Sequence, residues 1–274
     1  MKSRPRAIRR IKALNTFADI AAEVGGRSAG AVIGFQVGGV EGAIAGATSG
    51  SIATRTLRAT AVEFVSRTLS KREMQRAATA WGHAVRRIEE RQKAGERPRE
   101  DGFFDDDLTE RAAAKEIAEG LLIAAQRQHE ERKLRYLGNL YANLVFSPIL
   151  DRGSANAVLR QAEELSYRQF CVLAISAKRQ RLGSMGEHRL RIPWNQLLMS
   201  KATPINTLTV LDEIMDMQRR SLVEISEVAH GHISNVITVQ KLGGTLFDLL
   251  ELEGIERSHL AEIEALIDLP TDAG

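Results

Sequence analysis

Residues 26–50 read GRSAGAVIGFQVGGVEGAIAGATSG, with a glycine at every fourth position. A glycine in a solvated helix interior costs about 1 kcal/mol relative to alanine. A chain that accepts this cost repeatedly needs the missing side chains, most simply because helix backbones must approach closely. We therefore expect close helix packing along seven glycines: Gly26, Gly30, Gly34, Gly38, Gly42, Gly46 and Gly50.

One straight helix suits this spacing poorly. Four residues turn a helix by about 400°, so the glycine stripe drifts by about 40° at each step. The adjacent Gly38 and Gly39 permit a turn, because glycine readily adopts positive φ. We interpret residues 24–54 as a hairpin of two glycine-faced helices, with Glu41 at its tip.

The composition of this hairpin does not decide between a membrane and a soluble environment. Residues 29–53 carry one charge, Glu41, and are long enough to span a bilayer. They hold few large apolar side chains, and an acid at the bilayer centre costs about 2.5–3.5 kcal/mol. A membrane hairpin with cytoplasmic basic flanks and a soluble hairpin with tightly packed glycines both fit. The stretch resembles the glycine-zipper segments of bacterial membrane proteins, which implies membrane association.

Residues 1–23 predict an amphipathic helix with a basic face. Apolar residues recur at every third position from Ile8 to Ile20, unlike the apolar block of a secretory signal. Such a helix either lies on an anionic membrane or docks on the protein by its apolar stripe. The candidate lipid-docking residues are Arg6, Arg9, Arg10 and Lys12.

The overall composition indicates in which compartment the protein works and which partners its charge suggests. Cys171 is the only cysteine, so no intramolecular disulfide forms and a reducing compartment is expected. The net charge of +3 does not by itself imply a nucleic-acid partner. We expect the cytoplasm or the cytoplasmic face of the inner membrane.

The middle of the chain predicts ordinary amphipathic helices. Residues 55–93 form a helical arm, in which Ser70 and Glu73 make a capping box. Residues 94–104 contain charges, Gly95, Pro98 and Gly102, which is typical of a linker. Residues 105–153 form a helical body, and its opening acidic run suits a helix N-terminus.

Residues 154–274 show the element order of a winged-helix domain. Ser154 caps a first helix, Ser166 and Gln169 make a capping box that opens the next, and Pro193 suits the first turn of a later helix. The order helix, strand, helix, helix, strand, loop, strand places its third helix where winged-helix proteins contact DNA. The remaining expected elements are a strand at 189–192, helices at 194–200 and 205–219, strands at 222–226 and 236–240, and helices at 246–252 and 258–267.

The acidic side chains on the helix expected at 205–219 argue against nucleic-acid binding. Asp212, Glu213 and Asp216 oppose phosphate, so we favour a protein-contact or structural role. The candidate nucleic-acid contacts are Lys201, Asn206, Thr207, Arg219 and Arg220.

Several stretches resemble the bacterial Abi-alpha abortive-infection family. They are the glycine-containing N-terminal part, KLRYLGNLYANLVFS at 133–147, LSYRQFCVLAI at 165–175, and RRSLVEI at 219–225 followed by VITVQKLGGTLFDLL at 236–250. The resemblance implies a role in anti-phage defence through membrane damage and growth arrest. It transfers no functional residue.

The motifs of common enzymes are missing from the sequence. The glycines do not form a phosphate-binding loop. His230 and His232 lack a second ligand pair nearby, and Cys171 lies on an apolar helix face. We therefore expect a mainly α, non-enzymatic protein without cofactor or metal. The leading hypothesis is a homo-oligomeric, pore-forming membrane effector. The alternatives are a winged-helix DNA-binding regulator with a helical oligomerisation arm, and a soluble interaction scaffold.

Overall fold

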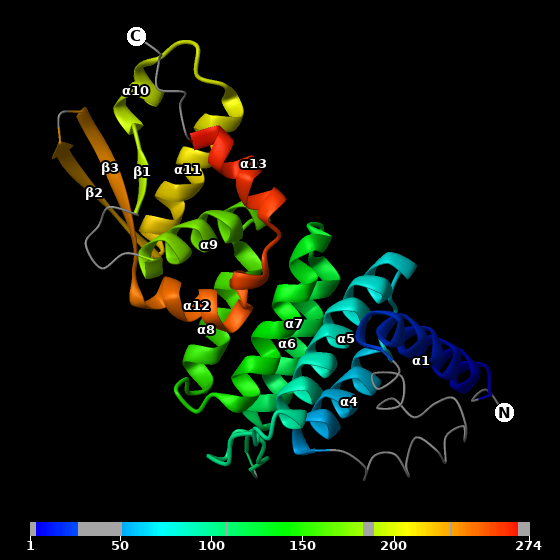
Figure 1. Cartoon of the computed structure of the whole chain (residues 1–274). Coiled ribbons are helices and arrows are strands. Elements are labelled where there is room, and N and C mark those ends of the chain that lie inside the picture. The colour runs from blue at the N-terminus through cyan, green and yellow to red at the C-terminus, as the bar shows by residue number, and fades with distance from the viewer. Residues whose placement is uncertain (1–3, 27–50, 108, 183–188, 231, 268–274) are drawn as a thin grey trace. The chain divides into compact units, whose positions relative to one another are not determined.

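The computed structural model describes residues 4–26, 51–107, 109–182, 189–230 and 232–267 (Figure 1). The chain divides into two compact units, Met1–Glu164 and Leu165–Gly274. It is mainly helical, with a small antiparallel sheet in the second unit, as predicted. Of the seven zipper glycines only Gly26 is described, with φ of 79°. Residues 27–50 of the predicted hairpin lie outside the described residues. The predicted bounds of 24 and 54 are wrong, because residues 24–25 end α1 and residues 52–54 open α4.

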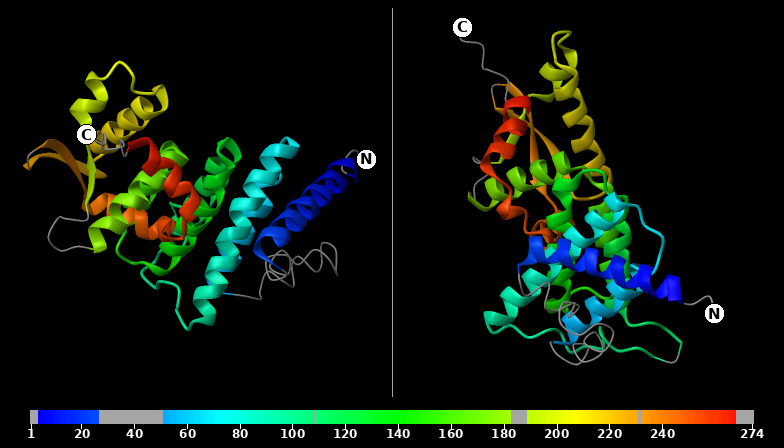
Figure 2. Two further views of the ribbon diagram at one scale, coloured as in Figure 1. Left: turned by 45° about the horizontal axis from the view of Figure 1, so that its top comes forward. Right: turned by 90° about the vertical axis from the view of Figure 1, so that its right-hand side faces the viewer.

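Helix α5 organises the first unit, because α1, α4, α6 and α7 all contact it. Figure 2 shows α1, α5 and α7 side by side. The elements are α1 (Arg4–Gly25), α4 (Ile52–Phe64), α5 (Lys71–Lys93), α6 (Ala113–Arg127), the 3-10 turn η1 (Glu131–Lys133), α7 (Leu134–Phe146) and α8 (Arg152–Glu164).

Small residues allow two helices to approach α5 very closely. A Cβ on Gly82 of α5 would lie 2.7 Å from the carbonyl oxygen of Ala21 in α1. A Cβ on Gly138 of α7 would lie 2.5 Å from the carbonyl oxygen of Ala80 in α5. Neither distance is compatible with a side chain, so these two glycines set the spacing of α1, α5 and α7.

Local capping decides where two of these helices begin. Ser70 and Glu73 form the predicted capping box at the start of α5. The prediction that Ser154 caps a helix is wrong, because α8 begins at Arg152. The Asp151 carboxylate accepts a hydrogen bond from the backbone N–H of Ser154 at 2.7 Å. Aspartate is an equally good N-cap and stands earlier in the chain.

Residues 94–104 are packed within the first unit and do not separate two units. The Arg99 guanidinium donates hydrogen bonds to the carbonyl oxygens of Ser147 and Leu150 at 2.8 and 2.9 Å. Phe103 and Phe104 are buried. Glycine, proline and charge predicted the end of a helix correctly, but tertiary hydrogen bonds hold the segment in place.

Helix α8 also belongs to the first unit, whereas the sequence analysis placed residues 154–164 with the C-terminal module. The buried Lys133 ammonium, next to α7, donates a hydrogen bond to the carbonyl oxygen of Glu163 at 2.7 Å. A cation at the carboxyl end of a helix is favourable. This contact joins α8 to the N-terminal helices.

The second unit surrounds helix α9 (Tyr167–Leu182) and a three-stranded sheet. The strand order is β1-β3-β2, and both pairings are antiparallel. Ile237 of β3 pairs with Leu190 of β1 and with Ile225 of β2. The other elements are β1 (Leu190–Ile192), α10 (Trp194–Met199), α11 (Ile205–Arg219), β2 (Val223–His230), β3 (His232–Val239), α12 (Lys241–Leu250), the 3-10 turn η2 (Leu252–Gly254) and α13 (Arg257–Ile267).

Three details of the second unit differ from the sequence analysis. The loop expected around His230 and His232 is part of a longer hairpin, because these two residues still pair across β2 and β3. Pro193 occupies the N-cap of α10 rather than its first turn. Helix α12 begins at Lys241, so Gly243 lies inside it and not before the helix expected at 246–252. A Cβ on Gly243 would lie 2.2 Å from the carbonyl oxygen of Leu222.

Candidate interaction surfaces

Trp81 in α5 holds both helices that flank the glycine segment. Its ring meets the Phe17 ring of α1 edge-on, with centroids 5.8 Å apart. Its indole N–H donates a hydrogen bond to the carbonyl oxygen of Leu57 in α4 at 3.2 Å. Trp81 is fully buried, so both contacts are shielded from water. The helix before the glycine segment and the helix after it are therefore anchored at one side chain.

The end of α1 and the start of α4 both lie within a few helical turns of this anchor. At 1.5 Å per helical residue, Gly26 lies about 14 Å from Phe17 along α1, and Ser51 about 9 Å from Leu57 along α4. The segment thus leaves from and returns to the same compact unit. A single crossing of a bilayer would separate its ends by about 30 Å of hydrocarbon.

Helix α1 docks on α5 by its apolar stripe, which was one of the two alternatives for residues 1–23. Leu14, Phe17 and Ala21 are buried, whereas Lys12 is exposed. The apolar stripe is occupied by protein, so lipid docking would use the basic face alone. The side chains of Arg6, Arg9 and Arg10 lie outside what the structure describes.

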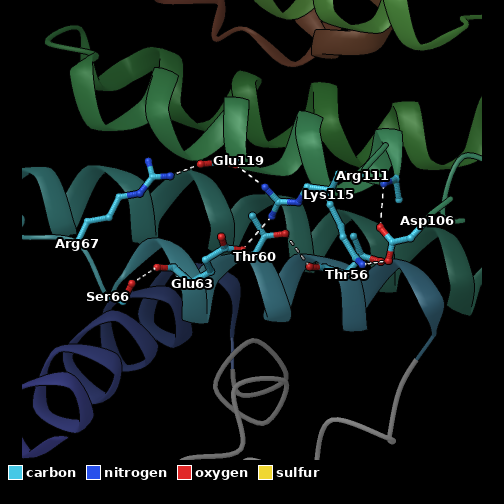
Figure 3. A network of polar contacts seen from close by, with 10 residues as sticks. Thr56, Thr60, Glu63, Ser66, Arg67, Asp106, Arg111, Lys115 and Glu119 are labelled. Carbon is cyan, nitrogen blue, oxygen red and sulfur yellow. Dashed lines mark hydrogen bonds and ion pairs between the residues drawn. The ribbon is translucent and has the colours of Figure 1, made fainter. Parts of the chain in front are cut away.

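Ion pairs fix α4 against α6 and the loop before it (Figure 3). The Arg111 guanidinium donates to Glu63 of α4 at 3.0 Å and to Glu119 of α6 at 2.5 Å, and Arg67 also pairs with Glu119. Burial raises the pKa of Glu119, but hydrogen bonds from Arg67 and Arg111 outweigh it and hold the pKa below its ordinary value. The charges neutralise one another, which indicates a structural network.

Contrary to expectation, the acidic run at 105–107 does not open a helix but lies in the loop before α6, which begins at Ala113. The Asp106 carboxylate accepts a hydrogen bond from the Ala112 backbone N–H at 2.9 Å and pairs with Lys115. These bonds hold the pKa of Asp106 below its ordinary value. Over the described ranges, no three His, Cys, Asp or Glu side chains gather as a metal site would require.

The candidate nucleic-acid contacts are not equally available. Lys201 and Asn206 are exposed. Thr207 is buried, and its hydroxyl donates a hydrogen bond to the carbonyl oxygen of Leu266 at 2.9 Å. Its proposed contact with a base is therefore wrong for this conformation: the hydroxyl is used to hold α11 to the end of α13. The sequence could not show this, because Leu266 is remote along the chain.

Both terminal arginines of α11 are near one acid. Arg220 donates to the Asp216 carboxylate at 2.7 Å, and Arg219 lies 3.6 Å from the same group. Burial raises the pKa of Asp216, yet hydrogen bonds from Gln169 and Arg220 lower it further than burial raises it. Arg219 remains mostly exposed, whereas Arg220 is half-buried. Only Arg219 keeps a side chain well placed for a further partner.

A second acid of α11 joins this helix to α9. The Glu213 carboxylate accepts hydrogen bonds from the Ser166 hydroxyl at 2.8 Å and from Arg168 Nε at 2.5 Å. Ser166 also forms the predicted capping box with Gln169. Two of the three acids on α11 thus orient the helix, and Asp212 is the exposed one of the three.

The sequence analysis missed an exposed apolar patch at the junction of α10 and α11. Leu198, Met199 and Ile205 are 54%, 84% and 74% exposed. We call these three residues the α10–α11 patch. Helix α10 is too short to show a periodic apolar face, so the sequence carried no signal that these side chains point outward.

No described helix combines the length and the apolar content needed to cross a membrane. Comparison with known protein families, curated proteins and solved structures found no match to this chain. The function is therefore inferred from the residues themselves: the shared anchor at Trp81, the basic face of α1 and the surface of α11.

Proposed function

We propose that this chain is a non-enzymatic, membrane-associated effector in which the residues between α1 and α4 form a hairpin that enters the bilayer and returns on the same side. The observation that carries this proposal is the shared anchor at Trp81, which contacts Phe17 before the segment and Leu57 after it. Two short glycine-faced helices joined near Gly38 and Gly39 meet this constraint. They also place Glu41 at the tip, within reach of water or headgroups.

Charge supports a cytoplasmic location for both ends. Lys12 before the segment and Arg55 after it are exposed. Basic flanks favour the cytoplasmic side and attract anionic lipid. Helices faced with small residues also associate closely within membranes. Together these features favour a homo-oligomer that perforates the inner membrane, and the resemblance to the Abi-alpha family suggests anti-phage growth arrest as its purpose.

Fractionation followed by cysteine labelling tests the proposal. The full chain should stay in the membrane pellet after a carbonate wash. In a Cys171→Ser background, single cysteines at the exposed Glu23 and Arg55 should both react with an impermeant reagent from the cytoplasmic side. Lys93→Cys, at the exposed end of α5, is the matched control. Release into the supernatant would contradict membrane association, and labelling of Glu23→Cys and Arg55→Cys from opposite sides would contradict the hairpin.

A second candidate is a winged-helix module in the second unit. The order α9-β1-α10-α11-β2-β3, with the strands arranged β1-β3-β2, supports it. DNA-binding members of this class place the helix equivalent to α11 in the major groove. Here the exposed Asp212 opposes phosphate, and Thr207 and Arg220 are committed to internal contacts. We therefore favour a protein-contact role for the module over a regulator that binds DNA.

Salt dependence separates these two roles of the module. A DNA-binding module would retain DNA in a salt-sensitive way and lose it when Lys201 and Arg219 become alanine. The protein-contact role predicts weak retention that these changes leave untouched. Strong retention that the double substitution abolishes would restore the DNA-binding alternative.

A further inference from the structure

His83 of α5 lies beside α7 with one nitrogen of its ring left without a partner. The Arg86 guanidinium Nη2 lies 3.4 Å from Nδ1 of His83. A guanidinium can only donate, so Nδ1 is the acceptor and Nε2 carries the proton of the neutral ring. Within the described ranges no group accepts a hydrogen bond from this Nε2–H. The ring therefore offers a free donor.

Two guanidinium groups near this ring also offer donors. Nε of Arg86 is buried and makes no hydrogen bond. The nearest acid is Glu90, at 3.6 Å from that nitrogen, and the same carboxylate lies 3.4 Å from Arg87. Arg135 of α7 is exposed and lies over the ring of its neighbour Tyr136, and it forms no ion pair with any described residue. One acid is thus shared among several arginines.

The electrostatics of His83 show the same excess of positive charge. Burial is the largest cause that lowers the pKa of His83 to about 4, and the charges of Arg86 and Arg135 lower it further. None of the described acids acts on this ring in the opposite direction. Positive groups gathered around a half-buried ring disfavour one another unless an anion lies between them. Donors and charge at this place therefore both match a bound anion.

We propose that His83, Arg86 and Arg135 bind a phosphate group. Phosphate oxygens accept hydrogen bonds from guanidinium groups in charge-assisted pairs, and the neutral Nε2–H of His83 adds a further donor. Inorganic phosphate and the headgroup of phosphatidic acid share this chemistry. The site lies on α5 and α7 within the first unit, so it does not depend on the path of residues 27–50.

Nuclear magnetic resonance of the histidine ring protons tests the site in the full chain, purified in non-ionic micelles. The His83 signal is assigned by its loss in His83→Asn. Inorganic phosphate should shift this signal in a saturable way, with chloride at equal ionic strength as the reference. Bound phosphate should also raise the pKa of His83 by about one unit, because an adjacent anion favours the protonated ring.

Substitutions separate the site from general attraction to a basic surface. Arg86→Gln and Arg135→Gln should each weaken phosphate binding about tenfold, since each removes a charge-assisted hydrogen bond. Glu90→Gln should strengthen it, because a competing carboxylate is lost. Arg72→Gln is the matched control: Arg72 is an exposed arginine of the same helix that pairs with Glu131, and its loss should leave binding unchanged.

A second arm distinguishes the two sources of phosphate. Micelles that contain phosphatidic acid replace the inorganic phosphate, and the same signal is followed. A response to the lipid that Arg86→Gln and Arg135→Gln weaken assigns the site to a headgroup as well. A response to inorganic phosphate alone assigns it to a soluble phosphate.

Three results would overturn the site. They are no saturable shift of the His83 signal with either source, binding unaffected by Arg86→Gln and Arg135→Gln, and an equal loss of binding in Arg72→Gln. Circular dichroism checks the fold of each variant. The unsubstituted chain and Glu90→Gln still decide the question if the arginine variants do not fold. Failure here leaves the membrane hairpin testable, because carbonate retention does not depend on His83.

Discussion

Gly138 of α7 faces the backbone of Ala80 in α5 so closely that a Cβ would lie 2.5 Å from the Ala80 carbonyl oxygen. The same Cβ would lie 2.8 Å from Cβ of His83 and 2.9 Å from the backbone nitrogen of Ala84. Backbone atoms cannot move aside as a flexible side chain can. The α5–α7 contact therefore depends on the absence of one methyl group.

Gly138→Ala should destabilise the first unit by about 1–3 kcal/mol, because overpacking forces the two helices apart. Gly244→Ala is the matched control. Gly244 lies within α12 and has no atom within 4 Å of its Cβ position, so alanine should be neutral or stabilise by up to about 1 kcal/mol. Chemical denaturation measures both. Equal stability of the two variants would mean that the α5–α7 contact relaxes freely.

Trp81→Phe should destabilise the first unit by about 1–3 kcal/mol. It removes the second hydrogen bond to the carbonyl oxygen of Leu57, which keeps its helical bond, and it leaves a cavity at a fully buried side chain. Hydrogen exchange of α4 should quicken more than that of α9. Trp194→Phe in α10 is the control, and faster exchange of α4 in that variant would argue against the specific role of Trp81.

Stability of the first unit should fall as the solution is acidified through the range from about pH 6.5 to about pH 4. Burial, helped by the positive charges of Arg86 and Arg135, lowers the pKa of His83 from 6.5 to about 4. Between these values the unfolded chain binds the proton that the folded chain excludes. The contribution of His83 is thus complete above about pH 6.5 and is lost as pH falls through about 4.

His83→Asn should flatten this slope, which for one proton is at most about 1.4 kcal/mol per pH unit. Denaturation at a series of pH values measures it. His129→Asn, at an exposed histidine, should keep the slope of the unsubstituted chain. Hydrogen bonds from Gln126 and Ser70 lower the pKa of Glu73 to about 2, so its own contribution is lost mainly below the range of His83.

Gly34→Leu combined with Gly42→Leu should abolish vesicle leakage and membrane toxicity while leaving the second unit folded. The bulky side chains would block the close helix contact that the glycine spacing predicts. Gly153→Leu adds a similar side chain at an exposed position of α8, where the nearest atom to a Cβ is 3.8 Å away. Vesicle leakage caused by the Gly153→Leu variant should equal that caused by the unsubstituted chain. Unchanged leakage in the double variant would eliminate pore formation through the glycine stripe.

Predictions based on near neighbours in the chain succeeded most often. The capping boxes at Ser70–Glu73 and Ser166–Gln169 are present, because each needs only residues three positions apart. The boundaries of α11 match the predicted range 205–219. Periodicity also identified the buried stripe of α1, although it could not say whether protein or lipid covers that stripe.

Predictions that required knowledge of distant contacts succeeded less often. The linker at 94–104 is held by carbonyl groups of Ser147 and Leu150, far along the chain. The Thr207 hydroxyl donates a hydrogen bond to the carbonyl oxygen of Leu266. Lys133 joins α8 to the first unit through its hydrogen bond to Glu163. Each of these contacts forms because packing brings together residues that are far apart in the chain. The residues near each group in the sequence therefore do not indicate its partner.

The sequence by itself determined the helical character, the capping sites, the glycine spacing and the order of elements in the second unit. These follow from backbone preferences and side-chain periodicity within a few residues. Tertiary structure alone decided that Trp81 contacts both helices that flank the glycine segment, that the apolar stripe of α1 packs on α5, and that Leu198, Met199 and Ile205 are exposed to solvent. These depend on which surfaces meet after helices pack, and burial is settled only by that packing.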